Sequence, residues 1–290
     1  MVVAQVVLTT AESRKLIAQA ISRMKPVRNA LQRFKLIIST SFIAPDILEA
    51  LDYGPITAQE RGLYICGMVR AEGLCATDPA RSKRSAILER GTIIEDPEAR
   101  MKAILSLGAG DVYIKSPNIL DQNGRVGVLA GAVDCGEVGG IIWGLTKQDF
   151  SIIAPTLLLK SAPIDLTALS EVVDANTYRR HASSFIQYSC GMPVNLVSLP
   201  ERTTVITEID AIRMAFDLAS KPIAMSGVGT GADAIALSVE GADEKVERFW
   251  GYICRIKGSP AQSVYPADCQ KCPLSKNPTS CGGYLAPTGI

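Results

Sequence analysis

The sequence predicts an α/β protein: a mostly parallel sheet with helices on both faces, followed by a smaller α+β domain and a Cys-rich metal-binding tail. The runs Leu36–Ile38 and Val112–Ile114 are wholly apolar, which is typical of strands buried on both faces of a parallel sheet. Helical segments alternate with such strands as far as Lys160. After Pro163 the expected order is strand, helix, strand, strand, helix, which is typical of a small antiparallel sheet. The expected parts are an α/β ligand-binding domain at 1–165, an α+β domain at 166–258 and a metal-binding tail at 259–290.

The elements of the first half follow from local signals. Thr9 and Glu12 form a capping-box pattern that opens a helix after an apolar lead-in. Pro26 ends or restarts this helix, and Asp96-Pro97-Glu98 starts another that runs to Leu107. The basic segment Arg81–Arg90 is helix-prone. Other expected elements are strands at Val2–Leu8, Leu36–Ile38, Val112–Ile114 and Ser151–Ala154, and helices at Val27–Phe34 and Pro45–Leu51.

The second half contains a glycine-rich turn between two expected strands. Gly227-x-Gly229-x-Gly231 lacks the spacing of a dinucleotide-binding fingerprint, so a hairpin turn explains it better. The surrounding elements are expected to be helices at Leu166–Val173, Glu208–Ala219 and Asp243–Lys257, and strands at Met192–Leu199, Pro222–Ser226 and Ala234–Val239.

Composition limits the classes of partner. Lys and Arg number 30 against 29 Asp and Glu, so no bulk charge attracts nucleic acid or an anionic membrane. The apolar run at the N-terminus is short and has no basic leader before it, so we expect a cytoplasmic protein. The single histidine, His181, argues against a histidine triad or a histidine-based zinc site.

A polar turn follows the first buried strand. Ser39, Thr40 and Ser41 lie between the strand at Leu36–Ile38 and the helix at Pro45–Leu51. Backbone N–H groups at such a helix start attract phosphate or carboxylate, so the turn is a candidate anion site. Ordinary helix capping is the alternative explanation.

Two motifs carry a resemblance to known proteins. They are the strand and turn at Leu36–Ser41 and the segment Asp111–Gly124, which continues through a Gly-rich loop to the strand Phe150–Pro155. Residues 1 to about 165 resemble the superfamily of sugar-phosphate isomerases, CoA transferases and lactate-utilisation proteins. The resemblance implies a small anionic ligand of phosphate, carboxylate or CoA type over the carboxyl ends of the parallel strands. The residues it implicates in substrate binding are Thr40, Ser41, Asn118, Gly136 and Gly139.

The chain departs from this superfamily at two places. Ser116-Pro117 replaces the small Gly-Ala pair before Asn118, and the catalytic carboxylate has no clear equivalent. Glu137 is the nearest candidate, and its alternative role is to cap a helix start at Gly139. Cys135 is a second candidate because it lies beside a glycine, as Cys190 does.

The sharpest signal is a group of cysteines near the C-terminus. Cys269-Gln270-Lys271-Cys272-Pro273 and the later Cys281 form a pattern in which thiolates reach one metal centre. We expect an iron–sulfur cluster, 4Fe-4S above all, with zinc as the alternative. Such a tail has no apolar periodicity and needs a metal to fold. The fourth ligand is open between Cys254, Cys135 and Cys190. Cys66 and Cys75 lie in apolar surroundings and are expected in the core.

These observations support three hypotheses. The first is a cytoplasmic iron–sulfur enzyme, of the lyase, sulfur-transfer or oxidoreductase class, with a cluster near the pocket of a small anionic substrate. The second is a non-enzymatic binding or assembly protein with a structural iron–sulfur or zinc tail. The third is a cluster-independent isomerase- or transferase-like enzyme that uses Glu137. A redox partner or a homo-oligomer is compatible with the first.

Overall fold

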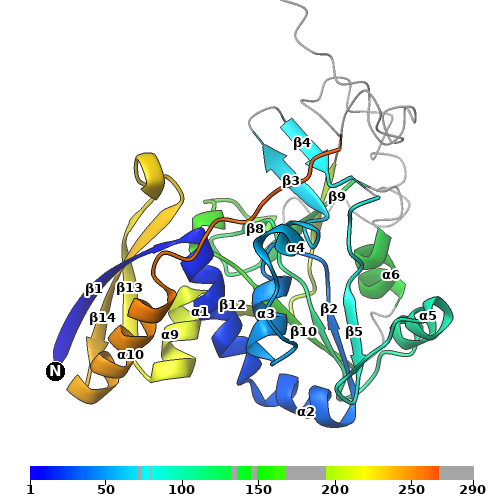
Figure 1. The fold of residues 1–290 in the computed structure, drawn as a ribbon, viewed down its shortest axis with the longest axis horizontal. Coiled ribbons are helices and arrows are strands. Elements are labelled where there is room, and N and C mark those ends of the chain that lie inside the picture. Colours follow the sequence, from blue (N-terminus) through cyan, green and yellow to red (C-terminus); the bar gives the residue numbers. More distant parts are fainter. Residues whose placement is uncertain (71–72, 79, 132–135, 145–148, 167–193, 268–290) are drawn as a thin grey trace, which may run out of the picture.

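The computed structural model describes residues 1–70, 73–78, 80–131, 136–144, 149–166 and 194–267 (Figure 1). Its main sheet has six strands in the order β12, β10, β7, β2, β5, β6. The first four strands run parallel to one another, whereas β5 is antiparallel to both of its neighbours, β2 and β6. The mixed sheet with parallel strands confirms the α/β prediction. The strands are β12 Thr204–Ile206, β10 Ser151–Pro155, β7 Val112–Ile114, β2 Lys35–Ile38, β5 Ala86–Glu89 and β6 Thr92–Ile93.

Helices cover both faces of this sheet because its central strands are apolar on both sides. Leu36 and Ile38 of β2 belong to the hydrophobic cluster that contains α1 and α3, whereas Ile37 belongs to the cluster that contains α5 and α6. Successive side chains of a strand point to opposite faces, so one short run of residues contributes to two cores. The helices are α1 Thr10–Ser22 and α3 Ala44–Ala50 on one face, and α5 Pro97–Leu105 and α6 Gly136–Gly144 on the other.

A second, antiparallel sheet of three strands has the order β1, β14, β13. The edge-to-face rings of Phe216 and Phe249, with centroids 5.3 Å apart, join the two helices that cover it. Strand β1 comes from the N-terminus, so this sheet crosses the boundary expected at residue 165, and α1 packs against helices of both sheets (Figure 1). The elements are β1 Val2–Thr9, β13 Ala219–Met225, β14 Ala234–Gly241, α9 Glu208–Phe216 and α10 Asp243–Ile256.

Smaller elements complete the described part. A short sheet has the order β11, β9, β8, and β3 pairs with β4 in a hairpin. The remaining elements are β3 Gly67–Arg70, β4 Gly73–Ala76, β8 Ile119–Leu120, β9 Val126–Ala130, β11 Asn195–Ser198, α2 Lys25–Arg33, α4 Ala58–Gly62, and the 3-10 turns η1 Leu158–Lys160 and η2 Gly229–Gly231. No described helix has the length and apolar character needed to cross a membrane.

Local signals predicted most elements correctly. The Thr9 capping box at the start of α1 and the hairpin between β13 and β14 are confirmed. The helix-prone interpretation of Arg81–Arg90 is wrong, because its residues Ala86–Glu89 form β5 between β2 and β6. Ile87 and Leu88 are fully buried on opposite faces of the sheet, and this burial outweighs helix propensity. Residues 167–193, with most of one expected helix and the start of one expected strand, lie outside the described part of the chain.

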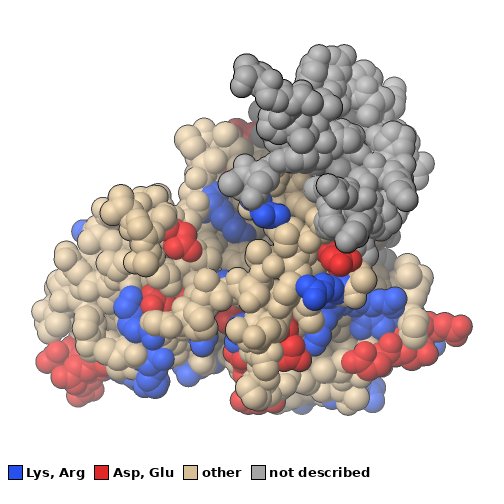
Figure 2. All heavy atoms as spheres, turned by 45° about the horizontal axis from the view of Figure 1, so that its top comes forward, with Lys and Arg blue, Asp and Glu red and all other residues tan. Residues whose placement is uncertain are grey.

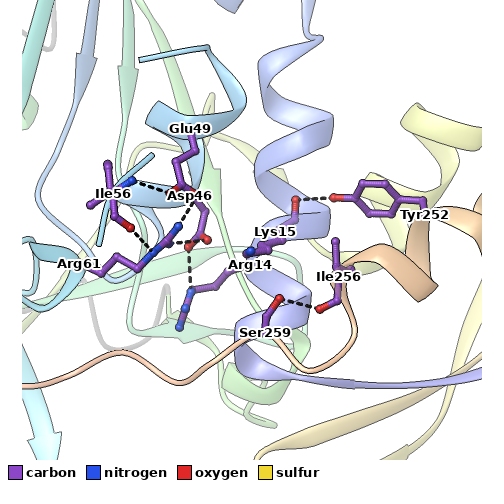
Figure 3. A network of polar contacts seen from close by, with 9 residues as sticks. All are labelled: Arg14, Lys15, Asp46, Glu49, Ile56, Arg61, Tyr252, Ile256 and Ser259. Carbon is purple, nitrogen blue, oxygen red and sulfur yellow. Dashed lines mark hydrogen bonds and ion pairs between the residues drawn. The ribbon is translucent and has the colours of Figure 1, made fainter. Parts of the chain in front are cut away.

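A buried ion-pair network joins α1, α3 and α4 (Figure 3). The Asp46 carboxylate accepts hydrogen bonds from Arg14 Nε at 3.0 Å and from Arg61 Nη1 at 2.8 Å. Arg61 also pairs with Glu49 and donates to the carbonyl of Ile56 at 3.2 Å. Buried charges are tolerated when their partners and hydrogen bonds are in place. The network therefore fixes α4, from which the chain leads directly to the β3–β4 hairpin.

Candidate functional site

A cavity of about 410 Å³ opens at the carboxyl ends of β2 and β7. Open α/β sheets bind ligands at this edge. The cavity lies among the turn after β2, the turn after β7, the β3–β4 hairpin, strand β9, the start of α6 and the end of η1. Residues that line it include Ser39, Thr40, Ser41, Phe42, Cys66, Met68, Cys75, Lys115, Pro117, Asn118, Val128, Gly136, Glu137 and Lys160.

Most of the described residues expected at a ligand site meet in this cavity. Thr40, Ser41 and Asn118 line it, together with Gly136 and Glu137. The Asn118 side chain accepts a hydrogen bond from the backbone of Leu129 at 2.9 Å, which ties the turn after β7 to β9. Helix α6 begins at Gly136, before the expected start at Gly139, and Gly139 is buried in the helix outside the described cavity lining.

Lys115 enters the cavity directly after strand β7. Its Nζ donates to Ser39 Oγ at 3.1 Å, so the lysine bridges the ends of two neighbouring strands. Burial lowers the pKa of Lys115, and the Glu137 carboxylate opposes this shift. Glu137 itself accepts a hydrogen bond from the hydroxyl of Tyr113 at 3.4 Å. Burial, followed by the charge of Glu137, raises the pKa of Tyr113, so its hydroxyl keeps the proton that it donates.

Lys160 reaches the same cavity from the end of η1. Its Nζ donates to the carbonyl of Pro117 and lies 4.2 Å from the centroid of the Phe42 ring. Burial lowers the pKa of Lys160 to about 7. The carboxylate of Glu208 opposes the shift, and the positive charge of Lys115 adds to it. Glu208 is itself buried at the start of α9, and burial raises its pKa.

Neither cavity lysine forms an ion pair within the part of the chain that the structure describes. The other buried cations differ: Arg14 and Arg61 share Asp46, and Lys35 Nζ lies 3.1 Å from an Asp111 oxygen. A buried ammonium without a counter-ion is costly because desolvation is not repaid. Glu137, which also lines the cavity, and the buried Glu208 partly offset the charge of the two lysines without forming an ion pair with them, while both signs of charge are interspersed on the face shown in Figure 2.

Sequence analysis missed both lysines, although each has a recognisable signal. Lys115 ends the run Val112-Tyr113-Ile114-Lys115, and Lys160 ends a longer apolar run that follows β10. A lone lysine at the end of a buried strand is placed by that strand at the carboxyl edge of the sheet. Glu208 gave no signal beyond an acidic residue in the first turn of a helix.

The cysteines fall into two groups. Cys66 and Cys75 line the cavity, and the prediction that they are core residues is wrong, since Cys66 is exposed and Cys75 is half-buried. The reason is that the β3–β4 hairpin stands at the edge of the sheet and lacks a covering layer within the described residues. Cys254 is exposed on α10, which packs against β1 and β14. The expected ligands Cys269, Cys272 and Cys281 lie outside the described residues, as do Cys135, Cys190 and His181.

The metal centre therefore stays a prediction. Over the described ranges, no three His, Cys, Asp or Glu side chains gather closely enough to hold a metal ion. The chain leading to the tail is placed, however. Asp78 N donates to the carbonyl of Tyr265 and Ala267 N donates to that of Ala76, each at 3.1 Å. Residues 265–267 thus lie along the hairpin that walls the cavity, two residues before Cys269.

Comparison of the chain with family models, with curated proteins and with solved structures finds no match. The function is therefore argued from the site itself.

The free energy of unfolding should rise with pH between about 7, the pKa of Lys160 in the fold, and its ordinary value of 10.5. In this window the unfolded chain holds a proton that the folded chain has released, so each pH unit adds up to about 1.4 kcal/mol. Urea unfolding at about pH 7 and about pH 9 measures the slope. Lys160→Met should flatten it, whereas Lys102→Met, on the exposed face of α5, should not. Equal slopes in the wild type and Lys160→Met would contradict the assignment.

Proposed function

We propose that the protein is an enzyme that binds a small anionic substrate, a carboxylate or a phosphate, in the cavity at the carboxyl edge of the main sheet. The observation that carries this proposal is the pair of half-buried lysines, Lys115 and Lys160, which line one cavity without an ion-pair partner among the described residues. An anion bound between them supplies the missing negative charge. Its binding then offsets the desolvation that the fold alone leaves uncompensated.

The size and lining of the cavity support a small ligand. Its volume of about 410 Å³ lies at the lower end of the range for small-molecule sites. Apolar side chains such as Phe42, Met68 and Val128 form much of the wall. The hydroxyls of Ser39, Thr40 and Ser41 and the two ammonium groups are concentrated at the strand ends. This separation of apolar wall and polar strand ends fits a compound with one charged end and a short carbon chain.

Glu137 gives the site a group for proton transfer. It lies in the first turn of α6, accepts a hydrogen bond from Tyr113, and interacts electrostatically with Lys115. A carboxylate near its substrate acts as a general base when the proton to be removed is within reach. We assign Glu137 this role. The isomerase- and transferase-like hypothesis uses the same residue.

Isothermal titration calorimetry with inorganic phosphate and with acetate tests anion binding. Lys115→Met and Lys160→Met should each weaken binding at least tenfold, which corresponds to about 1.4 kcal/mol. Glu137→Gln should strengthen it several-fold because a competing negative charge is removed. Wild-type affinity should fall as the pH rises through about 7, where Lys160 loses its charge. Lys102→Met is the control. Absence of binding, or equal affinity in all variants, would refute the proposal.

We also propose, as a second function of the chain, that the cysteine tail holds an iron–sulfur cluster near this cavity. The pairing of residues 265–267 with β4 favours it, because Cys269 follows two residues later. Cys66 and Cys75 lie at the same hairpin. They join Cys254, Cys135 and Cys190 as candidates for the fourth ligand of the cluster. A cluster there supplies Lewis-acid or redox chemistry to the substrate. Cysteines held as thiolate ligands fit the cytoplasmic location expected from the N-terminal sequence.

Anaerobically purified protein should contain iron and acid-labile sulfide, and Cys269→Ser should lose most of both because a thiolate ligand to iron is removed. Elemental analysis and the visible absorption spectrum make the measurement. Stoichiometric zinc, or no metal in any preparation, would contradict the cluster. If Cys269→Ser keeps phosphate affinity and lowers only thermal stability, the tail is a structural element, as in the binding-protein hypothesis.

A further inference from the structure

We propose that Lys160 forms an imine with the carbonyl carbon of the substrate, so that the substrate class is small 2-oxo acids. This inference rests on the proposed anion site, and it adds a second functional group to the ligand. A 2-oxo acid carries a carboxylate and an adjacent carbonyl. The cavity offers two amines, one for each group.

The surroundings of the two amines assign these roles. Lys115 interacts with the Glu137 carboxylate and donates to Ser39 Oγ at 3.1 Å, and both contacts favour the ammonium form, which can bind a carboxylate. Lys160 has an aromatic ring and one backbone carbonyl as its described contacts. A neutral amine keeps the hydrogen bond to the Pro117 carbonyl through one N–H and retains a lone pair for reaction.

Electrostatics support the same assignment. Desolvation in an apolar pocket and a neighbouring cation are the two conditions that activate a lysine as a nucleophile. Lys160 has both: burial lowers its pKa to about 7, and Lys115 contributes to the shift. Glu208, the carboxylate that acts on Lys160, opposes this shift, and burial raises the pKa of Glu208.

The reaction balances without an oxidant or a reductant. The lone pair of neutral Lys160 Nζ attacks the carbonyl carbon, and a proton moves from nitrogen to the carbonyl oxygen to give a carbinolamine. One proton from solvent converts the hydroxyl to water. The C–O bond breaks, water leaves, and a protonated imine remains. The positive imine nitrogen then withdraws electrons from the adjacent carbon of the substrate. A proton on that carbon becomes more acidic, and Glu137 can remove it.

Reductive trapping tests the inference. The full-length protein is incubated with glyoxylate, pyruvate or 2-oxoglutarate and sodium borohydride, then digested and analysed by mass spectrometry. Borohydride delivers hydride to the imine carbon, so the peptide with Lys160 should gain the mass of the probe less one oxygen atom. Lys160→Arg, which keeps the positive charge, should reduce total labelling at least tenfold. Lys102→Arg, at an exposed position, should not.

Phosphate calorimetry on the same preparations separates this inference from the anion site. Phosphate binding together with an adduct on Lys160 supports both. Phosphate binding without an adduct from any of the three probes overturns the imine and leaves the anion site. An adduct on Lys115, or one spread over exposed lysines without Lys160, also overturns the assignment. Specific labelling of Lys160 without phosphate binding would overturn the anion site alone.

Discussion

Two lysines that line one cavity without an ion-pair partner among the described residues are the constraint on which the site depends. Elsewhere in the described structure the fold compensates its buried cations: Asp46 holds Arg14 and Arg61 together. Among the described residues at the carboxyl edge of the sheet, Lys115 and Lys160 form no ion pair, and each donates to one acceptor, Ser39 Oγ and the Pro117 carbonyl respectively. A depressed lysine pKa costs about 1.4 kcal/mol of stability per unit below the ordinary value. We propose that an anionic substrate interacts with this charge.

The architecture explains why this charge can be held in place. Strands β2 and β7 are apolar on both faces, so their ends are rigid and present Ser39 and Lys115 side by side. The network around Asp46 fixes α4 and so the hairpin that closes the cavity. Phe42 lies under Lys160 and also 5.6 Å from the Arg14 guanidinium, which links that network to the cavity. Buried packing thus positions the polar groups, as a preorganised site requires.

Sequence patterns predicted the sheet better than the site. The apolar run Leu36–Ile38 forms a strand that is covered on both faces, as predicted. The capping box at Thr9 marks the start of a helix, also as predicted. Strand β5 was not predicted because its apolar centre is short and lies between basic residues. Its pairing with β2, which depends on the tertiary structure, makes it a strand. The resemblance implied a common pocket for Thr40, Ser41 and Asn118, and the structure brings these residues and Glu137 to one cavity. The lysines were missed because burial of a charged side chain depends on what folds over it, and local spacing does not carry that information.

The most direct test is an NMR titration of the lysine side chains, with Lys160 assigned from the Lys160→Met spectrum. The account predicts a midpoint near pH 7 for Lys160 in the free protein and a clear increase when phosphate is added, because a bound anion stabilises the ammonium. A midpoint at the ordinary lysine value, with no response to phosphate, would show that the amine is solvated and would contradict the account.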